Sequence, residues 1–218
     1  MNYVISICDP RALPTLTALC AELSLPVNVV LHAHGTAVRS MLDILGIESN
    51  EKRVVMTVAN TEKTKRLIEE QKRRLFIGVP GHGIVVAVPI KSIGGGKTVA
   101  FLNGNQQPAK YTPELNYSYE LIVAIANEGR TDQVMNAARA AGAAGGTVLH
   151  GKGTGSENAE KFYNVSIASE KEVILIVAKA EQKVGIMKAI LEKAGPASEA
   201  GTLAFSLPTS EVAGFGLL

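Results

Sequence analysis

The chain repeats itself with a period close to 118 residues. Val30–Ala37 (VLHAHGTA) recurs as Val148–Gly155 (VLHGKGTG), at an offset of 118 residues. Glu51–Val55 (EKRVV) recurs as Glu170–Ile174 (EKEVI), at an offset of 119 residues. Solenoid repeats have periods of roughly 20–50 residues, whereas this period has the length of a small domain. The sequence therefore predicts two homologous domains in one chain.

Length and composition agree with two small globular domains. The chain has 218 residues, and each half is long enough to bury a hydrophobic core of its own. The hydrophobic content of 46% and the charged content of 19% are ordinary for globular proteins. We expect one domain in residues 1–95, a second in residues 119–218 and a linker over residues 96–118.

Several classes of partner are disfavoured by the composition. The net charge is only +2, aromatic residues make up 5% of the chain and tryptophan is absent, so we expect no nucleic-acid partner. No apolar run approaches the roughly 18 residues of a membrane-spanning helix, so we expect no membrane insertion. Met1–Val4 lacks the features of a signal peptide, and Cys8 and Cys20 have no metal-ligand spacing. These features predict a cytoplasmic protein with two buried thiols.

Apolar spacing predicts the same order of elements in both halves. In the first half we expect strands at 3–8, 28–34, 53–59 and 84–90, and helices at 10–23, 38–47 and 62–75. In the second half we expect strands at 121–126, 147–150, 173–178 and 202–207, and helices at 131–141 and 181–194. A further strand is expected at 98–102 and a packed helical turn within 156–172. Apart from the short helix, the order is β-α-β-β-α-β, the ferredoxin-like arrangement of an α+β fold.

Capping residues mark the expected helix starts. Asp9 precedes a proline, and this pair is typical of an N-cap followed by the first helical position. Thr61 is the expected cap of the helix at 62–75. Thr131 or Asp132 is the expected cap of the first helix in the second half.

The strand predicted at 147–150 runs directly into a glycine-rich turn. Gly145-Gly146-Thr147-Val148-Leu149 is followed by Gly151, Gly153 and Gly155. Glycines let the backbone turn sharply and let a ligand approach closely, and the N–H groups of such turns can cradle a phosphate. The pattern indicates a candidate site for a phosphate or another small anion.

Together with the β-α-β-β-α-β order, the segment Gly145–Thr147 and the turn Gly151–Gly155 resemble the P-II nitrogen-regulatory family. The resemblance covers residues 3–95 and 119–216 and is closer in the second half. It implies a trimeric regulator, not an enzyme, that binds ATP or ADP in clefts between subunits, often with 2-oxoglutarate. It also implies a signalling loop, here within 156–172, that docks on a protein target. We therefore expect two P-II-like domains in tandem, with ATP, ADP or AMP as effector and a role in nitrogen regulation.

The resemblance also implies which residues bind the effector. In the second half they are Thr147, Lys152, Gly153, Thr154, Gly155, Lys171 and Gly201. In the first, more divergent half they are Gly35, Thr36, Gly81 and Gly83. Ile84 and Thr202 stand where the family's last turn has a lysine, which removes a charge-assisted bond to a nucleotide. The expected effector is therefore a small anion, of which an adenine nucleotide is one.

Self-association is expected from the same resemblance. Ferredoxin-like sheets have open edges that favour pairing with another chain. P-II rings contain three subunits, and three chains with two domains each would fill two such rings. We expect a homo-oligomer of three chains.

Two alternatives to a nucleotide sensor stay open. His32 and His34 lie two residues apart on a predicted strand, so both side chains project to the same side, as chelation requires. This pair leaves open a metal-responsive protein like the CutA proteins, which share the fold. No cysteine or carboxylate stands at ligand spacing, so we expect no metal site. The other alternative is a P-II-shaped scaffold without nucleotide binding. No catalytic set of residues can be assembled from the sequence, so we do not expect an enzyme.

Overall fold

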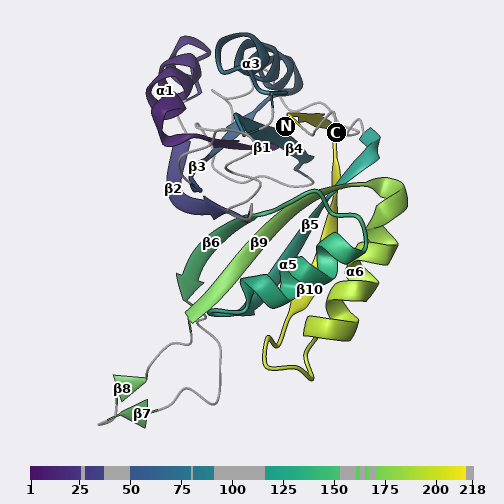
Figure 1. Cartoon of the computed structure of the whole chain (residues 1–218). Coiled ribbons are helices and arrows are strands. Elements are labelled where there is room, and N and C mark those ends of the chain that lie inside the picture. Colours follow the sequence, from purple (N-terminus) through teal and green to yellow (C-terminus); the bar gives the residue numbers. More distant parts are fainter. Residues whose placement is uncertain are drawn as a thin grey trace. The chain divides into compact units, whose positions relative to one another are not determined.

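The structure is a computed structural model that describes residues 1–25, 28–36, 50–79, 81–90, 116–152, 161–162, 165–166 and 170–214. The chain divides into two compact units (Figure 1). Unit 1 comprises Met1–His32, Val38–Tyr119 and Leu207–Leu218, and unit 2 comprises Ala33–Ala37 and Glu120–Ser206. Each unit is thus built mainly from one half of the chain, while the limits 1–95 and 119–218 stay a prediction.

In the described residues, unit 1 is an antiparallel sheet with the α-helices α1 and α3. Its elements are β1 (Asn2–Cys8), the 3-10 helix η1 (Pro10–Ala12), α1 (Leu13–Glu22), β2 (Asn28–Gly35), β3 (Glu51–Ala59), α3 (Thr61–Arg74), β4 (Gly83–Pro89) and β11 (Glu211–Ala213). The strand order is β2-β3-β1-β4-β11, and β1 pairs antiparallel with both β3 and β4. Because β11 pairs with β4, a segment from the C-terminal half completes the edge of this sheet.

Unit 2 has the same plan. Its elements are β5 (Asn116–Asn127), α5 (Thr131–Ala140), β6 (Thr147–Lys152), β7 (Lys161–Phe162), β8 (Val165–Ser166), β9 (Glu170–Lys179), α6 (Ala180–Ala194) and β10 (Leu203–Thr209). The strand order is β10-β5-β9-β6. The end of β2 adds to the outer edge of β6, where His34 pairs with Val148 and Gly35 pairs with Thr147.

The ferredoxin-like prediction is confirmed in both units. In each, the four main strands lie in the order fourth, first, third, second, with two helices in the β-α-β-β-α-β sequence. The period recurs in the elements, since β3 begins at Glu51 and β9 at Glu170, 119 residues later. Within the described ranges, no helix is long and apolar enough to cross a membrane.

Two of the helix starts differ from the sequence prediction. Asp9 is an N-cap as predicted, and its carboxylate accepts the N–H of Arg11 at 3.0 Å, but the helix that begins there is the 3-10 helix η1. Asn60 caps α3, because its Oδ1 accepts the N–H of Lys63 at 2.8 Å, and Thr61 is the first helical residue. Asparagine and threonine are both good N-caps, so propensity alone does not rank neighbours in the sequence.

The segment between β6 and β9 also corrects a prediction. A helical turn is predicted within 156–172, but the described residues there form the short antiparallel strands β7 and β8, in which Phe162 pairs with Val165. Aromatic and β-branched residues have high strand propensity, and apolar spacing over so short a stretch does not separate strand from helix. The helix predicted at 38–47 and the strand predicted at 98–102 lie outside the described residues.

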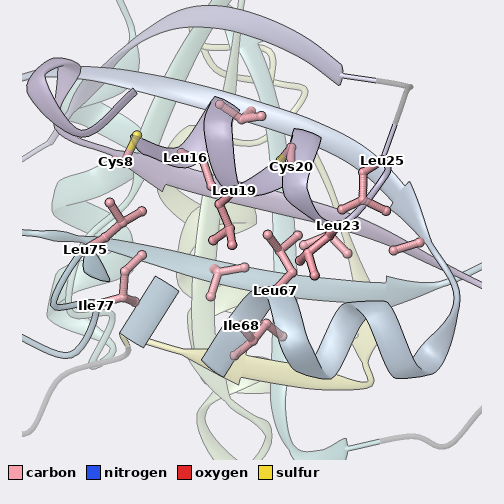
Figure 2. Packing of buried hydrophobic residues seen from close by; sticks show 14 of the residues in the cluster. Cys8, Leu16, Leu19, Cys20, Leu23, Leu25, Leu67, Ile68, Leu75 and Ile77 are labelled. Carbon is pink, nitrogen blue, oxygen red and sulfur yellow. The ribbon is translucent and has the colours of Figure 1, made fainter. Parts of the chain in front are cut away.

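The core of unit 1 lies between its helices and its sheet. Figure 2 shows Leu16 and Leu19 of α1 and Leu67 of α3 in this core, and all three side chains are almost fully buried. Burying one such side chain stabilises the fold by about 1.5–3 kcal/mol. Cys8 and Cys20 are free and buried, as predicted, and burial raises the pKa of each thiol to about 11. Both thiols therefore stay protonated and unreactive at neutral pH.

Helices α5 and α6 pack on the sheet of unit 2 (Figure 1). Their buried residues are Val134, Met135, Ala137, Ala138, Ile186, Ile190 and Ala194. A Cβ at Gly146 would lie 3.1 Å from Sδ of Met135 and 3.2 Å from the backbone oxygen of Leu175. Packing of α5 against the sheet therefore accounts for this glycine of the Gly-Gly-Thr-Val segment, without a ligand.

Gln71 of α3 is a weak point in the packing of unit 1. The residue is fully buried, and within the described part of the chain neither polar atom of its side-chain amide has a hydrogen-bond partner. A buried unpaired amide costs about 1–3 kcal/mol, so Gln71→Met should raise the free energy of unfolding in urea by about 1 kcal/mol. Lys72→Met, at the exposed neighbour, is the control and should change it by less than about 0.5 kcal/mol. A loss of stability in Gln71→Met would contradict the expectation.

Candidate functional site

Lys171 stands at one end of the unit 2 sheet. It is the second residue of β9 and pairs with Gly151 near the end of β6. Its Nζ donates to Oδ1 of Asn127 at 2.5 Å, and Nδ2 of Asn127 donates to the backbone oxygen of Glu199 at 2.9 Å. Asn127 therefore ties the lysine at the start of β9 to the end of β5 and to the segment before β10.

Gly201 belongs to the same group. Its φ is +54°, and a Cβ there would lie 3.1 Å from Nδ2 of Asn127. Any other residue would be strained and would press on the amide that holds Lys171. The structure thus brings together two predicted site residues, Lys171 and Gly201, through one that the prediction missed. The signal for Asn127 is the repeat itself, since Asn127 follows Asp9 at the offset of 118 residues.

The positive charge of Lys171 has a neutral partner. Lys171 is half-buried, and among the described residues no carboxylate forms an ion pair with it. The nearby carboxylate of Glu199 is 2.7 Å from the guanidinium of Arg130. An ammonium group that is partly removed from water and bonded to an amide oxygen can still accept an anion as a charge-assisted partner.

The neighbouring carboxylate of Glu172 is committed to a helix. Glu172 is only 5% exposed, and its Oε2 accepts the backbone N–H groups of Arg130 at 3.1 Å and Thr131 at 2.9 Å, and the hydroxyl of Thr131 at 2.8 Å. It caps α5 in place of the predicted Thr131 or Asp132, because helix N-termini attract negative charge from any part of the chain. Glu172 therefore fixes α5 to β9 beside Lys171.

Two further carboxylates form a pair at the same end of the sheet. The backbone N–H of Glu128 donates to the backbone oxygen of Glu170 at 3.3 Å. A side-chain hydrogen bond to Glu170 and then repulsion from its charge raise the pKa of Glu128. Glu172 adds to this rise, whereas His150 opposes it. The negative charge of Glu170 therefore favours the protonated form of Glu128.

Unit 1 holds a copy of the lysine arrangement. Lys52 is the second residue of β3, and its Nζ donates to the backbone oxygen of Gly81 at 3.1 Å. Burial lowers the pKa of Lys52, and the nearby carboxylate of Asp9 opposes this shift. Asp9 itself is paired with Arg11 at 2.9 Å. In both units, therefore, the lysine that enters the third strand bonds to a neutral oxygen.

The predicted glycines of unit 1 have unequal roles. Gly81, with φ +85°, supplies the oxygen that receives Lys52. Gly83 has φ +136°, and a Cβ there would lie 2.1 Å from the backbone oxygen of Ile7. Close pairing of β4 with β1 therefore requires glycine at 83 whether or not a ligand binds.

Three other predicted residues lie at the opposite end of β6. Thr147 is buried and pairs with Gly35, and Oγ1 of Thr36 accepts the N–H of Gly146 at 2.9 Å. Gly151 lies four positions after Thr147 along the strand, a distance of about 13 Å. Gly153, Thr154 and Gly155 lie outside the described residues, as does the side chain of Lys152.

The histidines form a pair rather than a cluster. The rings of His34 and His150 meet edge to face with centroids 5.9 Å apart. Over the described ranges of the chain, no group of three or more His, Cys, Asp or Glu residues is placed to hold a metal ion.

Comparison with known proteins gives a family for the second half of the chain. Residues 119–215 match the family model described as nitrogen regulatory protein P-II. This half of the chain is therefore similar to a P-II domain. The first half has the same order of elements but lies outside the match, so the tandem duplication of this domain is supported only in part. A comparison with curated proteins gave no match.

Solved structures similar to this chain include two P-II proteins. The Arabidopsis thaliana PII protein bound to citrate is 24% identical, with a TM-score of 0.35, over 44% of this chain and 78% of that one. The B. subtilis GlnK–ATP complex is 14% identical, with a TM-score of 0.34, over 45% and 95%. An unknown protein from Galdieria sulphuraria is 10% identical, with a TM-score of 0.28, over 95% and 97%.

The turn between α6 and β10, residues 195–202, contains no lysine or arginine. Gly201 is exposed, but the side chain of Thr202, at the position of the family's lysine, is fully buried. Positive charge at this end of the sheet must come from elsewhere in the domain. Lys171 is in position to supply it, since Asn127 links it directly to this turn.

The Glu128–Glu170 pair predicts a pH-dependent stability. The pKa of Glu128 is raised in the folded protein, so the pair contributes stability at low pH that is lost as the pH rises through this raised pKa. Glu128→Gln removes the repulsion and keeps a hydrogen-bonding amide. Its melting temperature should exceed that of the wild type at about pH 8 and equal it at about pH 4.

Glu181→Gln, at an exposed carboxylate of α6, is the control for Glu128→Gln and should show no gain at high pH. A gain in Glu128→Gln that is the same at both pH values would rule out repulsion within the pair as its cause.

Proposed function

We propose that this chain is a P-II-type regulatory protein whose second domain binds a small anionic effector. The first candidate is an adenine nucleotide, ATP, ADP or AMP, whose binding is passed to a protein target in nitrogen regulation. The match of residues 119–215 to a family of nitrogen regulatory proteins supports this class of function over an enzyme. Assembly of three chains and the linker at 96–118 belong to the same proposal.

The observation that carries the proposal is the setting of Lys171. Its ammonium group bonds to a neutral amide, while Glu172 is occupied by α5 and Glu199 by Arg130. Among the described residues, no carboxylate forms an ion pair with the half-buried ammonium group of Lys171. Lys52 repeats this arrangement in unit 1, which supports the same electrostatic role there and a second site, with Gly81 beside it.

The remaining proposed ligands follow β6 in the sequence. β6 ends at Lys152, so Gly153, Thr154 and Gly155 continue from the strand that pairs with the start of β9. In this proposal the backbone N–H groups of the turn bind anionic oxygens, and Lys152 and Lys171 supply positive charge. Thr147, Gly35 and Thr36, which the sequence also predicts as effector ligands, lie at the other end of β6.

Calorimetric titration tests this site. ATP, ADP and AMP, each with and without 2-oxoglutarate, are titrated into the wild type, Lys171→Met and Lys188→Met. A hydrogen bond to a charged group contributes about 1.5–3 kcal/mol, so loss of Lys171 should weaken binding by about 10- to 150-fold. Lys188 is an exposed lysine of α6, 3.7 Å from Glu192, and its substitution should leave affinity unchanged.

Each other outcome has a defined meaning. Equal affinity in Lys171→Met and the wild type would place the site elsewhere. If no nucleotide binds, the nucleotide proposal is rejected, and the alternatives are a P-II-shaped scaffold without nucleotide binding or a metal-responsive protein. Zinc binding that is lost in His34→Ala would favour the metal-responsive alternative, for which the contact between His34 and His150 is the supporting observation.

A further inference from the structure

The connection between α3 and β4 holds an aromatic side chain outside the fold. Leu75 and Ile77 are buried, at 6% and 5% exposure, whereas Phe76 between them is 61% exposed. Phe76 also has φ +53°, in the left-handed region that bulky residues avoid. The backbone is therefore strained in a conformation that turns a large apolar side chain towards solvent.

Local hydrogen bonds fix this conformation. The N–H of Val79 donates to the backbone oxygen of Phe76 at 3.0 Å, and the N–H of His82 donates to the backbone oxygen of Val79 at 3.1 Å. The ring of His82 meets Phe76 edge to face with centroids 6.3 Å apart, and Val79 is 48% exposed. Phe76, Val79 and His82 thus form one preorganised surface, called here the Phe76 patch.

The fold itself does not demand this residue. The period of 119 residues places Gly195 at the position of Phe76 in the second half. A Cβ at Gly195 would lie 2.1 Å from the backbone oxygen of Leu191, so the same connection in unit 2 excludes any side chain. Strain that is retained at an exposed position, and absent from the equivalent connection, points to a function outside folding.

Positive charge borders the Phe76 patch. α3 carries six lysine and arginine residues against three glutamates, and its last turn contains Lys72, Arg73 and Arg74. Glu70 is hydrogen-bonded to both arginines, whereas Lys72, four residues before Phe76, is exposed. Arg74 is also paired with Glu22, so among the described cations of this last turn Lys72 is the one that acidic side chains of a partner would complement.

We propose that the Phe76 patch docks a segment of a partner protein that carries an apolar side chain flanked by carboxylates. Phe76 is the anchor, because exposed rigid aromatic residues contribute most to such contacts. Lys72 pairs with the carboxylates. This surface lies in unit 1 and does not involve Lys171, so the test of docking and the test of the Lys171 site fail independently.

The test uses a phage library of random dodecapeptides, selected on the wild-type protein. Enriched peptides should combine Asp or Glu with Leu, Ile or Phe. In fluorescence anisotropy their affinity should fall about tenfold or more for Phe76→Gly, by a smaller factor for Lys72→Glu, and not at all for Val184→Ser. Val184 is the control because it is an apolar residue of unit 2 with 69% exposure.

Stability separates docking from a structural role. Glycine adopts φ +53° without strain, so Phe76→Gly should melt at a higher temperature than the wild type while it loses the peptides. A lower melting temperature would show that Phe76 serves the fold. The proposal is overturned equally by failure to enrich acidic, apolar peptides, or by peptides that bind Phe76→Gly as tightly as the wild type.

Discussion

The candidate site depends on one hydrogen bond, from the charged ammonium group of Lys171 to the neutral side-chain oxygen of Asn127. The amide nitrogen of Asn127 in turn donates to the segment before β10. Among the described carboxylates at this end of the sheet, Glu172 binds α5, Glu199 binds Arg130, and Glu128 and Glu170 bind each other. Replacing Asn127 by aspartate would neutralise the lysine without moving it. The choice of amide over carboxylate therefore keeps this end of the sheet attractive to anions.

The two units share an order of elements and equivalent residue positions, but the contacts of those residues differ. Lys52 and Lys171 both enter the third strand and both bond to neutral oxygens, one from a backbone carbonyl and one from a side chain. Gly83 is needed because β4 approaches β1 closely, whereas Gly201 is needed because Asn127 lies beside it. The same glycine pattern thus supports sheet pairing in one unit and the positioning of a lysine in the other.

The fold could be predicted from the sequence because its signals are local and occur twice. Apolar spacing predicts β3 and β9 within three residues at each end, and the repeat confirms their equivalence. The cap of α5 could not be predicted, since Glu172 lies 41 residues from Thr131 and acts only after folding. The sequence also predicts Lys171 and Thr147 as parts of one site. In the structure Thr147 begins β6, whereas Lys171 pairs with Gly151 near the other end of that strand. Distances of this kind depend on strand pairing, which the sequence does not state. The position of Asn127 could be identified from the sequence, because the period aligns it with Asp9.

Labelling of lysine amines tests most directly whether the charge of Lys171 receives the effector. The protein is pulsed with an amine-acylating reagent, with and without ATP, ADP, AMP and 2-oxoglutarate, and each lysine is quantified by mass spectrometry. We expect at least one of these anions to protect Lys171 selectively, with exposed Lys188 as the internal reference. Labelling of Lys171 that is unchanged by every anion would contradict an effector site at this end of the sheet.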